Sequence, residues 1–518
     1  MAFAARSIGN TVVCIQCDLG LDCLSGRVGV APSTEEKAKL CHRSAVLWPA
    51  RLQRDRADGM VMRSHSQRIS DRLGVPVAGA AVVTVLLGAA LQIPAVAVLG
   101  ALLLGLAGVL WTDLLPAVLV LGGACDFLTG GEVGVVSLVV GPLLLSAAWR
   151  FSRGRGVLQR GWLVLGLIVA CATLLSVAGA TDVSSAMNSY FVLLELLLMA
   201  ISCWQFPPSG SVSARATAFE VLAAVFVFVS GFVALRFGKL SVNNGRLTLM
   251  QGVNPNSYAI ALAQVGTFIL GYLTMLTGRV VRTLAWLSLA ACSCLIVLIG
   301  SRSSLVGLAA GSTLILFIWV RQGHRWRQVL SLLIGATVGG IVGGRAFEAS
   351  FPALASRWGV DAVVKTGGSG RTMLWQYTLR AFGSRPILGF GIGGRNLNIA
   401  WSAMGVPWDL QTLSAHNIVL AILADVGLVG FVPLFVLCCA VLKTAVAAVR
   451  RSIAEVVPYF AVLVCSLAIG VGEYMYLDKV LWVAGIWTVV LATSAPASLA
   501  ARVLPIDGAQ DRRKHGRN

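Results

Sequence analysis

The chain has 518 residues, of which 57% are hydrophobic and only 12% are charged, and its formal net charge is +19. Its mean hydropathy is +0.82, which is too high for a protein that folds in water. These values exclude a soluble globular enzyme and indicate a polytopic membrane protein.

Apolar runs long enough to cross a bilayer as helices recur from Pro76 to Pro496. We predict an all-α fold with about 12 to 14 membrane-spanning helices and a large extracytoplasmic loop before a late helix. The predicted helices cover residues 76 to 93, 95 to 111, 114 to 128, 133 to 150, 161 to 179, 189 to 206, 218 to 236, 257 to 276, 283 to 299, 304 to 320, 329 to 346, 417 to 442, 458 to 475 and 479 to 496.

Three regions follow from this pattern. Residues 1 to 75 are polar and basic, and we expect a disordered cytoplasmic extension or a start site called too early, with Met60 or Met62 as the true start. Residues 76 to 497 form the transmembrane domain, which includes an outer loop over 347 to 416, and residues 498 to 518 form a basic cytoplasmic tail. The extension contains Cys14-x-x-Cys17 without a second close pair, so we expect neither a metal site nor a cofactor.

Basic residues predict the orientation, because short loops rich in Lys and Arg stay in the cytoplasm. With fourteen spans, both termini and the four most basic short loops fall on the cytoplasmic side; these loops carry Arg150 to Arg160, Arg279 and Arg282, Arg321 to Arg327, and Lys443 to Arg451. The loop 347 to 416 then faces outward. It carries six cations that suggest an anionic ligand, namely Arg357, Lys365, Arg371, Arg380, Arg385 and Arg395.

Two arginines lie near turns on the predicted outer face. Arg246 and Asn256 flank an Asn-Pro-Asn turn, where the alternatives are a substrate contact or ordinary helix capping, and the next helix is expected to begin at Ser257. Arg302 lies between serines at a near-loopless junction of two apolar helices. It is a candidate site residue, although a snorkelling arginine is the alternative.

The outer loop carries Gly-rich segments. Arg371 follows GGSG and begins a run with Leu374, Trp375, Thr378, Leu379 and Phe382 on one helical face, which predicts an amphipathic helix on the membrane. A guanidinium at this position could bind a diphosphate, or could be an ordinary surface arginine. The glycines from 389 to 394 follow no recognisable strand, so we reject a nucleotide-binding loop.

His416 is the candidate general base. It follows Ser414, a suitable N-cap, so we expect it in the first turn of the next helix, where the helix dipole disfavours the imidazolium ion. A neutral imidazole can accept a proton from an attacking hydroxyl. The alternative is that His416 and Asn417 only cap and dock the helix.

These motifs together resemble the O-antigen ligase and polymerase superfamily of bacterial envelope enzymes. The likeness covers roughly residues 215 to 495 and rests on the order of Asn-Pro-Asn, Ser-Arg-Ser, Gly-Arg-x-x-x-Trp, Pro-x-x-Gly-x-Gly and His-Asn-x-x-Leu, then Gly427-Leu428-Val429-Gly430, Glu473 and Trp482.

The resemblance implies a metal-independent glycosyltransferase of the bacterial cytoplasmic (inner) membrane whose active site faces outward. It would use a polyprenyl-diphosphate-linked glycan donor, with Arg302 and Arg371 on the diphosphate and His416 activating or orienting the acceptor. Arg246, Asn256, Asn417 and Glu473 are further candidates for substrate binding.

Two questions stay open from the sequence. The acceptor could be a growing glycan, a lipid core or a protein hydroxyl. A secondary transporter or flippase for envelope glycans is the alternative function, because Asp126, Glu195 and Glu220 lie in or near early helices. No nucleic-acid partner is expected.

Overall fold

The computed structural model describes residues 73–126, 134–153, 159–206, 211–237, 247–249, 254–322, 371–407 and 414–494. All of them belong to the unit Ile69–Asn518. Arg246, the cysteines of the N-terminal extension, the basic tail and the predicted helix 329 to 346 lie outside the described residues.

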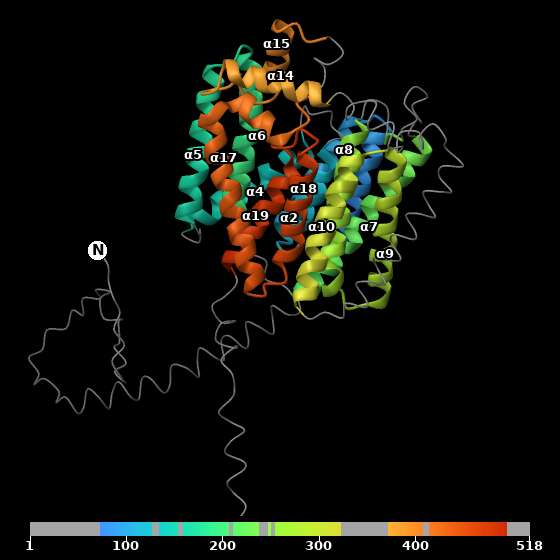
Figure 1. The fold of residues 1–518 in the computed structure, drawn as a ribbon. Coiled ribbons are helices and arrows are strands. Elements are labelled where there is room, and N and C mark those ends of the chain that lie inside the picture. The colour runs from blue at the N-terminus through green and yellow to red at the C-terminus, as the bar shows by residue number, and fades with distance from the viewer. Residues whose placement is uncertain are drawn as a thin grey trace, which may run out of the picture. The chain divides into compact units, whose positions relative to one another are not determined.

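The described residues form a helical bundle (Figure 1). Eight of their helices are long and apolar enough to cross a membrane, and five shorter apolar helices accompany them. The long ones are Leu73–Ala90, α5 (Arg160–Ala178), α6 (Val183–Cys203), α7 (Val212–Phe237), α8 (Pro255–Tyr272), α9 (Arg279–Ile299), α10 (Arg302–Arg321) and α17 (Ile418–Arg450). The shorter ones are α2 (Pro94–Leu110), α3 (Leu115–Cys125), α4 (Val135–Ser152), α18 (Val456–Gly470) and α19 (Lys479–Ser494).

The all-α polytopic prediction is therefore confirmed, with differences at helix ends. Helix α8 begins at Pro255 and not at Ser257, because Pro suits the first helical position and Asn254 caps the backbone N–H of Asn256 at 2.9 Å. Helix α17 continues to Arg450, so Lys443 lies within the helix and not in a loop.

Helices α8, α10 and α18 pack together in the bundle. Nearly all of α8 is buried, as expected for a helix that is apolar on every face. Gly307 and Gly311 of α10 allow close approach to α18, since a Cβ atom would lie 2.9 Å from the carbonyl oxygen of Cys465 and 3.0 Å from that of Ala461, respectively. Small residues four apart are a common means of close helix packing in membranes.

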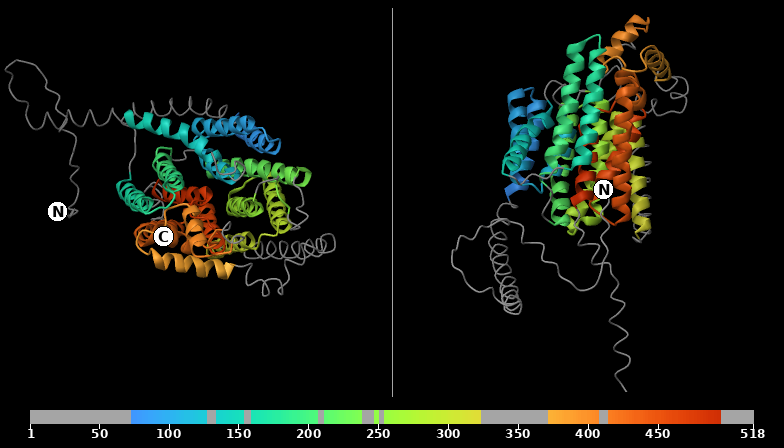
Figure 2. Two further views of the ribbon diagram at one scale, coloured as in Figure 1. Left: turned by 90° about the horizontal axis from the view of Figure 1, so that it is seen from above. Right: turned by 90° about the vertical axis from the view of Figure 1, so that its left-hand side faces the viewer.

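Two further helices cover one end of the bundle, which we call the site end. Helix α14 (Arg371–Ser384) lies across this end, roughly perpendicular to the bundle helices, and α15 (Arg395–Ala403) follows it (Figures 1 and 2). The predicted amphipathic helix is present, with Leu374 and Thr378 buried. Leu379, predicted on the same face, is 51% exposed, because at 3.6 residues per turn it is rotated roughly 100° away from Thr378.

The glycine segment after α14 fits into a break in α17. Gly427 has non-helical backbone angles, with φ of 60°, and the N–H groups of Leu428 and Val429 donate to the carbonyls of Pro386 and Ile387 at 2.9 and 3.1 Å. A Cβ atom on Gly427 would lie 2.3 Å from the Ile387 carbonyl oxygen. The glycines thus serve backbone packing, consistent with the rejection of a nucleotide loop.

Candidate functional site

The carboxylate of Glu473 is the centre of a polar cluster at the site end. It lies in the segment between α18 and α19, and its side chain is only 8% exposed. Its Oε1 accepts hydrogen bonds from Arg371 Nη2 at 2.9 Å, Ser303 Oγ at 3.1 Å and Asn256 Nδ2 at 3.4 Å. Its Oε2 lies 3.0 Å from His416 Nδ1. We call these five residues the Glu473 site.

The contact with Glu473 fits the tautomer of His416 that carries its hydrogen on Nδ1. In that tautomer Nδ1 donates to Oε2, because an ionised carboxylate can only accept hydrogen bonds. In the neutral ring, Nε2 is then the acceptor. This is the arrangement of a general base held by a carboxylate partner.

The predicted N-cap Ser414 is wrong by three residues, and so is the prediction that His416 lies in the first helical turn. The N-cap is Asn417, whose Oδ1 accepts from the N–H groups of Val419 and Leu420 at 3.0 and 3.1 Å, and not Ser414. His416 precedes the cap with φ of 45° and so lies outside the first helical turn. A side-chain partner of the ring is the carboxylate of Glu473.

Backbone contacts hold His416 and Asn417 in place. Trp375 Nε1, on α14, donates to the carbonyl oxygen of His416 at 3.3 Å. Asn417 Nδ2 donates to the carbonyl oxygen of Val471 at 3.3 Å, at the start of the segment that carries Glu473. Asn417 thus has the capping and docking role that was the alternative to substrate binding.

Arg302 is the first residue of α10 and is half-buried. Its neighbour Ser303 contacts Glu473 at 3.1 Å, so Arg302 begins a helix whose first turn belongs to the site. The structure thus brings Arg371, His416 and Asn256 each into contact with Glu473, and Arg302 directly precedes Ser303, a fourth partner of that carboxylate.

A second polar cluster holds the Glu473 segment against α17. Asp425 is fully buried, and its Oδ2 accepts from Tyr474 OH and Tyr476 OH, both at 2.7 Å, and from the Gly394 N–H at 3.1 Å. Burial raises the pKa of both tyrosines well above the ordinary value, so their hydroxyl groups remain donors. Asp425 therefore connects the glycine segment with the residue next to Glu473.

The sequence interpretation missed Ser303, Trp375, Asp425 and Tyr474 as parts of the site. Ser303 and Trp375 are in the motifs quoted above, but their contacts are 170 and 41 residues away in the chain. Asp425 offered a clearer signal, as a carboxylate within the apolar run of α17.

The early carboxylates divide into two cases. Asp126 and Glu195 lie 2.9 and 3.8 Å from Lys479 Nζ, while Ser137 Oγ accepts from Lys479 and donates to Glu195, both at 2.9 Å. We call these four residues the Lys479 cluster. Glu220 on α7 is fully buried, and neither of its carboxylate oxygens has a hydrogen-bond partner among the described residues.

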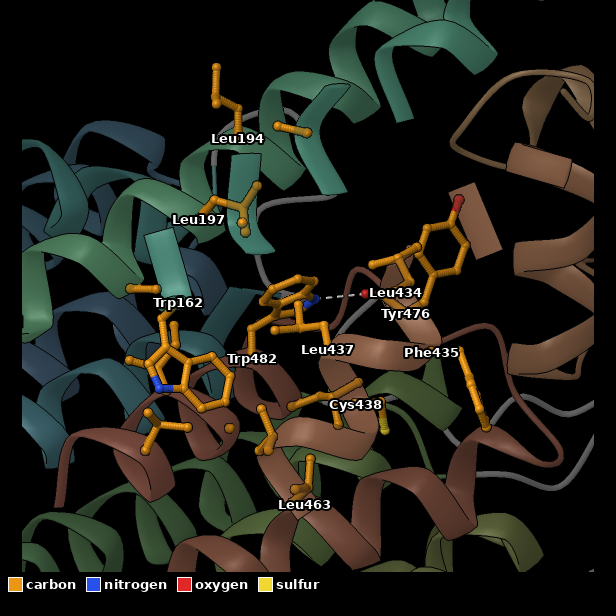
Figure 3. A pocket seen from close by; sticks show the side chains of 18 of the residues that line it. Trp162, Leu194, Leu197, Leu434, Phe435, Leu437, Cys438, Leu463, Tyr476 and Trp482 are labelled. Atoms are coloured by element: carbon orange, nitrogen blue, oxygen red, sulfur yellow. Dashed lines mark hydrogen bonds between the residues drawn. The ribbon is translucent and has the colours of Figure 1, made fainter. Parts of the chain in front are cut away.

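An apolar cavity of about 460 Å³ lies between α5, α6, α17, α18 and α19. Figure 3 shows leucines, Trp162, Trp482 and Phe435 around it. Ile418 and Val419 also line it, two and three residues after His416 in the chain. The cavity lining therefore includes the first turn of α17.

Comparison with known families agrees with the motifs. Residues 287–435 match the family model described as O-antigen ligase, which supports assignment of the chain to the O-antigen ligase and polymerase superfamily of glycan-transferring membrane proteins. The matched segment includes Arg302, Arg371 and His416, whereas Glu473 lies beyond it. No curated protein matches the chain.

Proposed function

We propose that the protein transfers a glycan from a polyprenyl-diphosphate-linked donor to a hydroxyl group of a glycan or lipid acceptor. The observation that carries this proposal is the single carboxylate of Glu473, which contacts both the cation Arg371 and the base candidate His416. One site thus combines a guanidinium that can bind the leaving diphosphate with an imidazole that can take the acceptor proton.

The chemistry follows from these positions. The acceptor oxygen forms a bond to the anomeric carbon as the bond from that carbon to the diphosphate oxygen breaks. The acceptor proton passes to His416 Nε2, and the diphosphate leaves with the bonding electron pair. Arg371 and Arg302 stabilise the charge on the leaving group, and Glu473 stabilises the imidazolium ion that forms.

The donor is already activated by its diphosphate, so the residues need only position two substrates and stabilise charge. General-base catalysis is worth about 10²- to 10⁴-fold, and one preorganised donor to a developing anion about 10²- to 10³-fold. Asn256 remains a proposed substrate contact, since its amide already faces the same carboxylate.

The apolar cavity suits the isoprenoid chain of the carrier. A cavity of about 460 Å³ lined by leucine, isoleucine and aromatic side chains can take several isoprene units. Since Ile418 and Val419 line it, a chain inside the cavity would bring its diphosphate end toward His416. The tail would then be bound along α17, and the reacting group beside His416, two residues before the start of that helix.

The basic residues support an outward-facing site in the cytoplasmic membrane. Helices α10 and α17 begin at the site end, and their last turns carry Arg321 and Arg450 at the opposite end. Cationic ends of helices stay on the cytoplasmic side. The Glu473 site then faces the outer side of the membrane. A donor that is activated by its own diphosphate needs no nucleoside triphosphate there.

A flippase or secondary transporter is the second candidate, favoured by the buried charges of the Lys479 cluster. The two functions differ in product. We expect the purified protein in nanodiscs to form a new glycosidic bond when given a carrier-linked donor and acceptor. Movement of the intact donor across a proteoliposome membrane without bond formation would establish the transporter instead.

The test of the residues uses His416→Ala and Arg371→Ala, with Arg380→Ala as the matched control. Arg380 lies on the same helix as Arg371 and contacts the ring of Tyr377 at 5.8 Å. We expect the first two variants to lose transfer and to accumulate carrier-linked donor. The control should keep wild-type transfer and a wild-type level of carrier-linked donor. Full activity of His416→Ala would overturn the proposed site.

A further inference from the structure

The two oxygens of Glu473 serve different partners. Oε1 accepts from Arg371 at 2.9 Å, from Ser303 at 3.1 Å and from Asn256 at 3.4 Å, whereas Oε2 faces His416 at 3.0 Å. The proposed leaving-group cation and the proposed base therefore share one negative charge. An ion pair with Arg371 reduces the negative potential that the same carboxylate exerts at the imidazole.

We propose that the diphosphate of the donor displaces Glu473 from Arg371, and that the released carboxylate then supports His416 as the base. This inference rests on the proposed function and adds an order to it. Donor binding comes first and prepares the site to activate the acceptor. A bound acceptor without donor would meet a weaker base.

Of the two ion-pair partners, Arg371 is the one that can exchange Glu473 for a diphosphate. Its side chain is 29% exposed, whereas that of Glu473 is 8% exposed. The guanidinium has five N–H donors in a planar fork, which suits the oxygens of a phosphate group as well as those of a carboxylate. A diphosphate carries more charge and more acceptor oxygens than Glu473, so it competes for the same fork.

Glu473 keeps hydrogen-bond donors after the exchange. Ser303 and Asn256 still contact Oε1, and both are neutral. A buried carboxylate without donors would be strongly unfavourable, because burial of an unpaired charge carries a large penalty. These two side chains lower that penalty without cancelling the negative charge, so the charge acts on His416.

The backbone next to Glu473 also lies close to the guanidinium of Arg371. A Cβ atom on Gly472 would lie 2.7 Å from Arg371 Nη1, so the backbone beside Glu473 lies against the guanidinium. Movement of Arg371 toward a diphosphate would therefore change contacts with Gly472 as well as with Glu473.

Glu473→Gln tests the exchange, because it removes the charge and keeps each contact. The Gln carbonyl can accept from Arg371 and Ser303, and its amide can donate to His416 Nδ1. This donation places the ring hydrogen on Nε2, the wrong tautomer for a base. We expect inorganic diphosphate to bind the full-length variant in nanodiscs about three- to tenfold more tightly, while transfer slows about 100-fold or more.

A double-mutant cycle separates exchange from general charge repulsion. In an Arg371→Ala background, Glu473→Gln should give no gain in diphosphate affinity, since the cation that it frees is absent. A gain that persists without Arg371 would overturn the exchange. Unchanged or weaker diphosphate binding by the single Glu473→Gln variant would also overturn the exchange. Size-exclusion chromatography and thermal unfolding check that this variant is folded.

The control for these measurements is Asp182→Asn. Asp182 Oδ2 pairs with Arg395 Nε at 3.1 Å, but Arg395 is 71% exposed and the pair does not contact His416. We expect this variant to bind inorganic diphosphate as the wild type does.

The cycle also separates this inference from the proposed function. If Arg371→Ala leaves both diphosphate binding and transfer unchanged, the proposed function fails at this residue. If Arg371→Ala weakens both but Glu473→Gln does not tighten binding, only the exchange fails.

Discussion

Among the charged clusters of the described residues, the Lys479 cluster and the Glu473 site differ in the kind of partner that each buried charge has. In the Lys479 cluster, one cation that is 8% exposed contacts two carboxylates and a hydroxyl group. In the Glu473 site, one carboxylate that is 8% exposed contacts a cation that is 29% exposed and an imidazole. The first cluster connects α3, α4, α6 and α19, while the second leaves Arg371 and His416 with donors or acceptors for a ligand.

We propose that this difference separates a structural role of the Lys479 cluster from a catalytic role of the Glu473 site. Buried charges that are fully paired hold helices together, and removal of one partner leaves an unpaired charge. Partly exposed charges with unused hydrogen-bonding groups can interact with a substrate. The residue pattern does not make this distinction, because Asp126, Glu195 and Glu473 are all carboxylates near the ends of or within apolar runs; only the family resemblance pointed to Glu473.

The largest expected effect is on catalysis at His416. His416→Ala should reduce transfer by about 10²- to 10⁴-fold, the usual contribution of a general base, while membrane levels stay normal. His416→Gln can orient an acceptor but cannot take its proton at neutral pH. The measurement is the amount of glycan product and of carrier-linked donor in membranes that contain each variant. Near-normal turnover of the Gln variant would show that His416 only positions the acceptor.

For the Lys479 cluster we expect the opposite result, a loss of stability with the chemistry retained in the folded fraction. Lys479→Met leaves Asp126 and Glu195 without their cation, and such a loss costs about 3 to 5 kcal/mol. Thermal unfolding in detergent measures it. Addition of Asp126→Asn should recover part of the loss.

The control for Lys479→Met is Lys443→Met, at an exposed position of α17. Normal stability of Lys479→Met together with lost transfer would reverse the comparison and place Lys479 in the active site.

The helices were predictable because hydrocarbon requires long apolar runs, and each predicted span within the described residues corresponds to an observed helix. Capping was harder. Ser414 and Asn417 are both good caps, and the choice depends on contacts from distant segments, such as Asn417 Nδ2 with the Val471 carbonyl. Single-sequence periodicity contains no information on such contacts.

The candidate site was partly predictable for the same reason. Arg371 and His416 each lie in a recognisable motif, and histidine is rare in the chain, so the sequence indicated both as candidates. Their common contact with Glu473 joins positions 102 and 57 residues apart, and only the packed bundle brings these together. The break at Gly427 was equally hidden, since glycine is common in membrane helices.

A smaller effect is expected from Arg371→Lys, which keeps the charge but loses the planar fork. Lysine at this position can reach Glu473 or a phosphate oxygen at one point only. We expect about a tenfold loss of transfer, less than for Arg371→Ala, with weaker binding of inorganic diphosphate. Equal activity of the Lys variant and the wild type would show that charge alone matters at this position. The Glu473 site would then need a positive charge and no specific fork of donors, as the Lys479 cluster does.

The smallest expected effect is at Trp375, which acts on His416 only through the backbone. Trp375→Phe removes the 3.3 Å hydrogen bond to the His416 carbonyl oxygen and keeps an aromatic ring in place. A bond of this kind contributes about 0.5 to 1.5 kcal/mol, so transfer should fall about two- to tenfold while inorganic diphosphate binds normally. Trp149→Phe, at a position that is 59% exposed on α4, is the matched control and should change neither quantity. If Trp375→Phe weakens diphosphate binding as much as it slows transfer, the indole supports Arg371 on the same helix, and His416 is held by Glu473 alone.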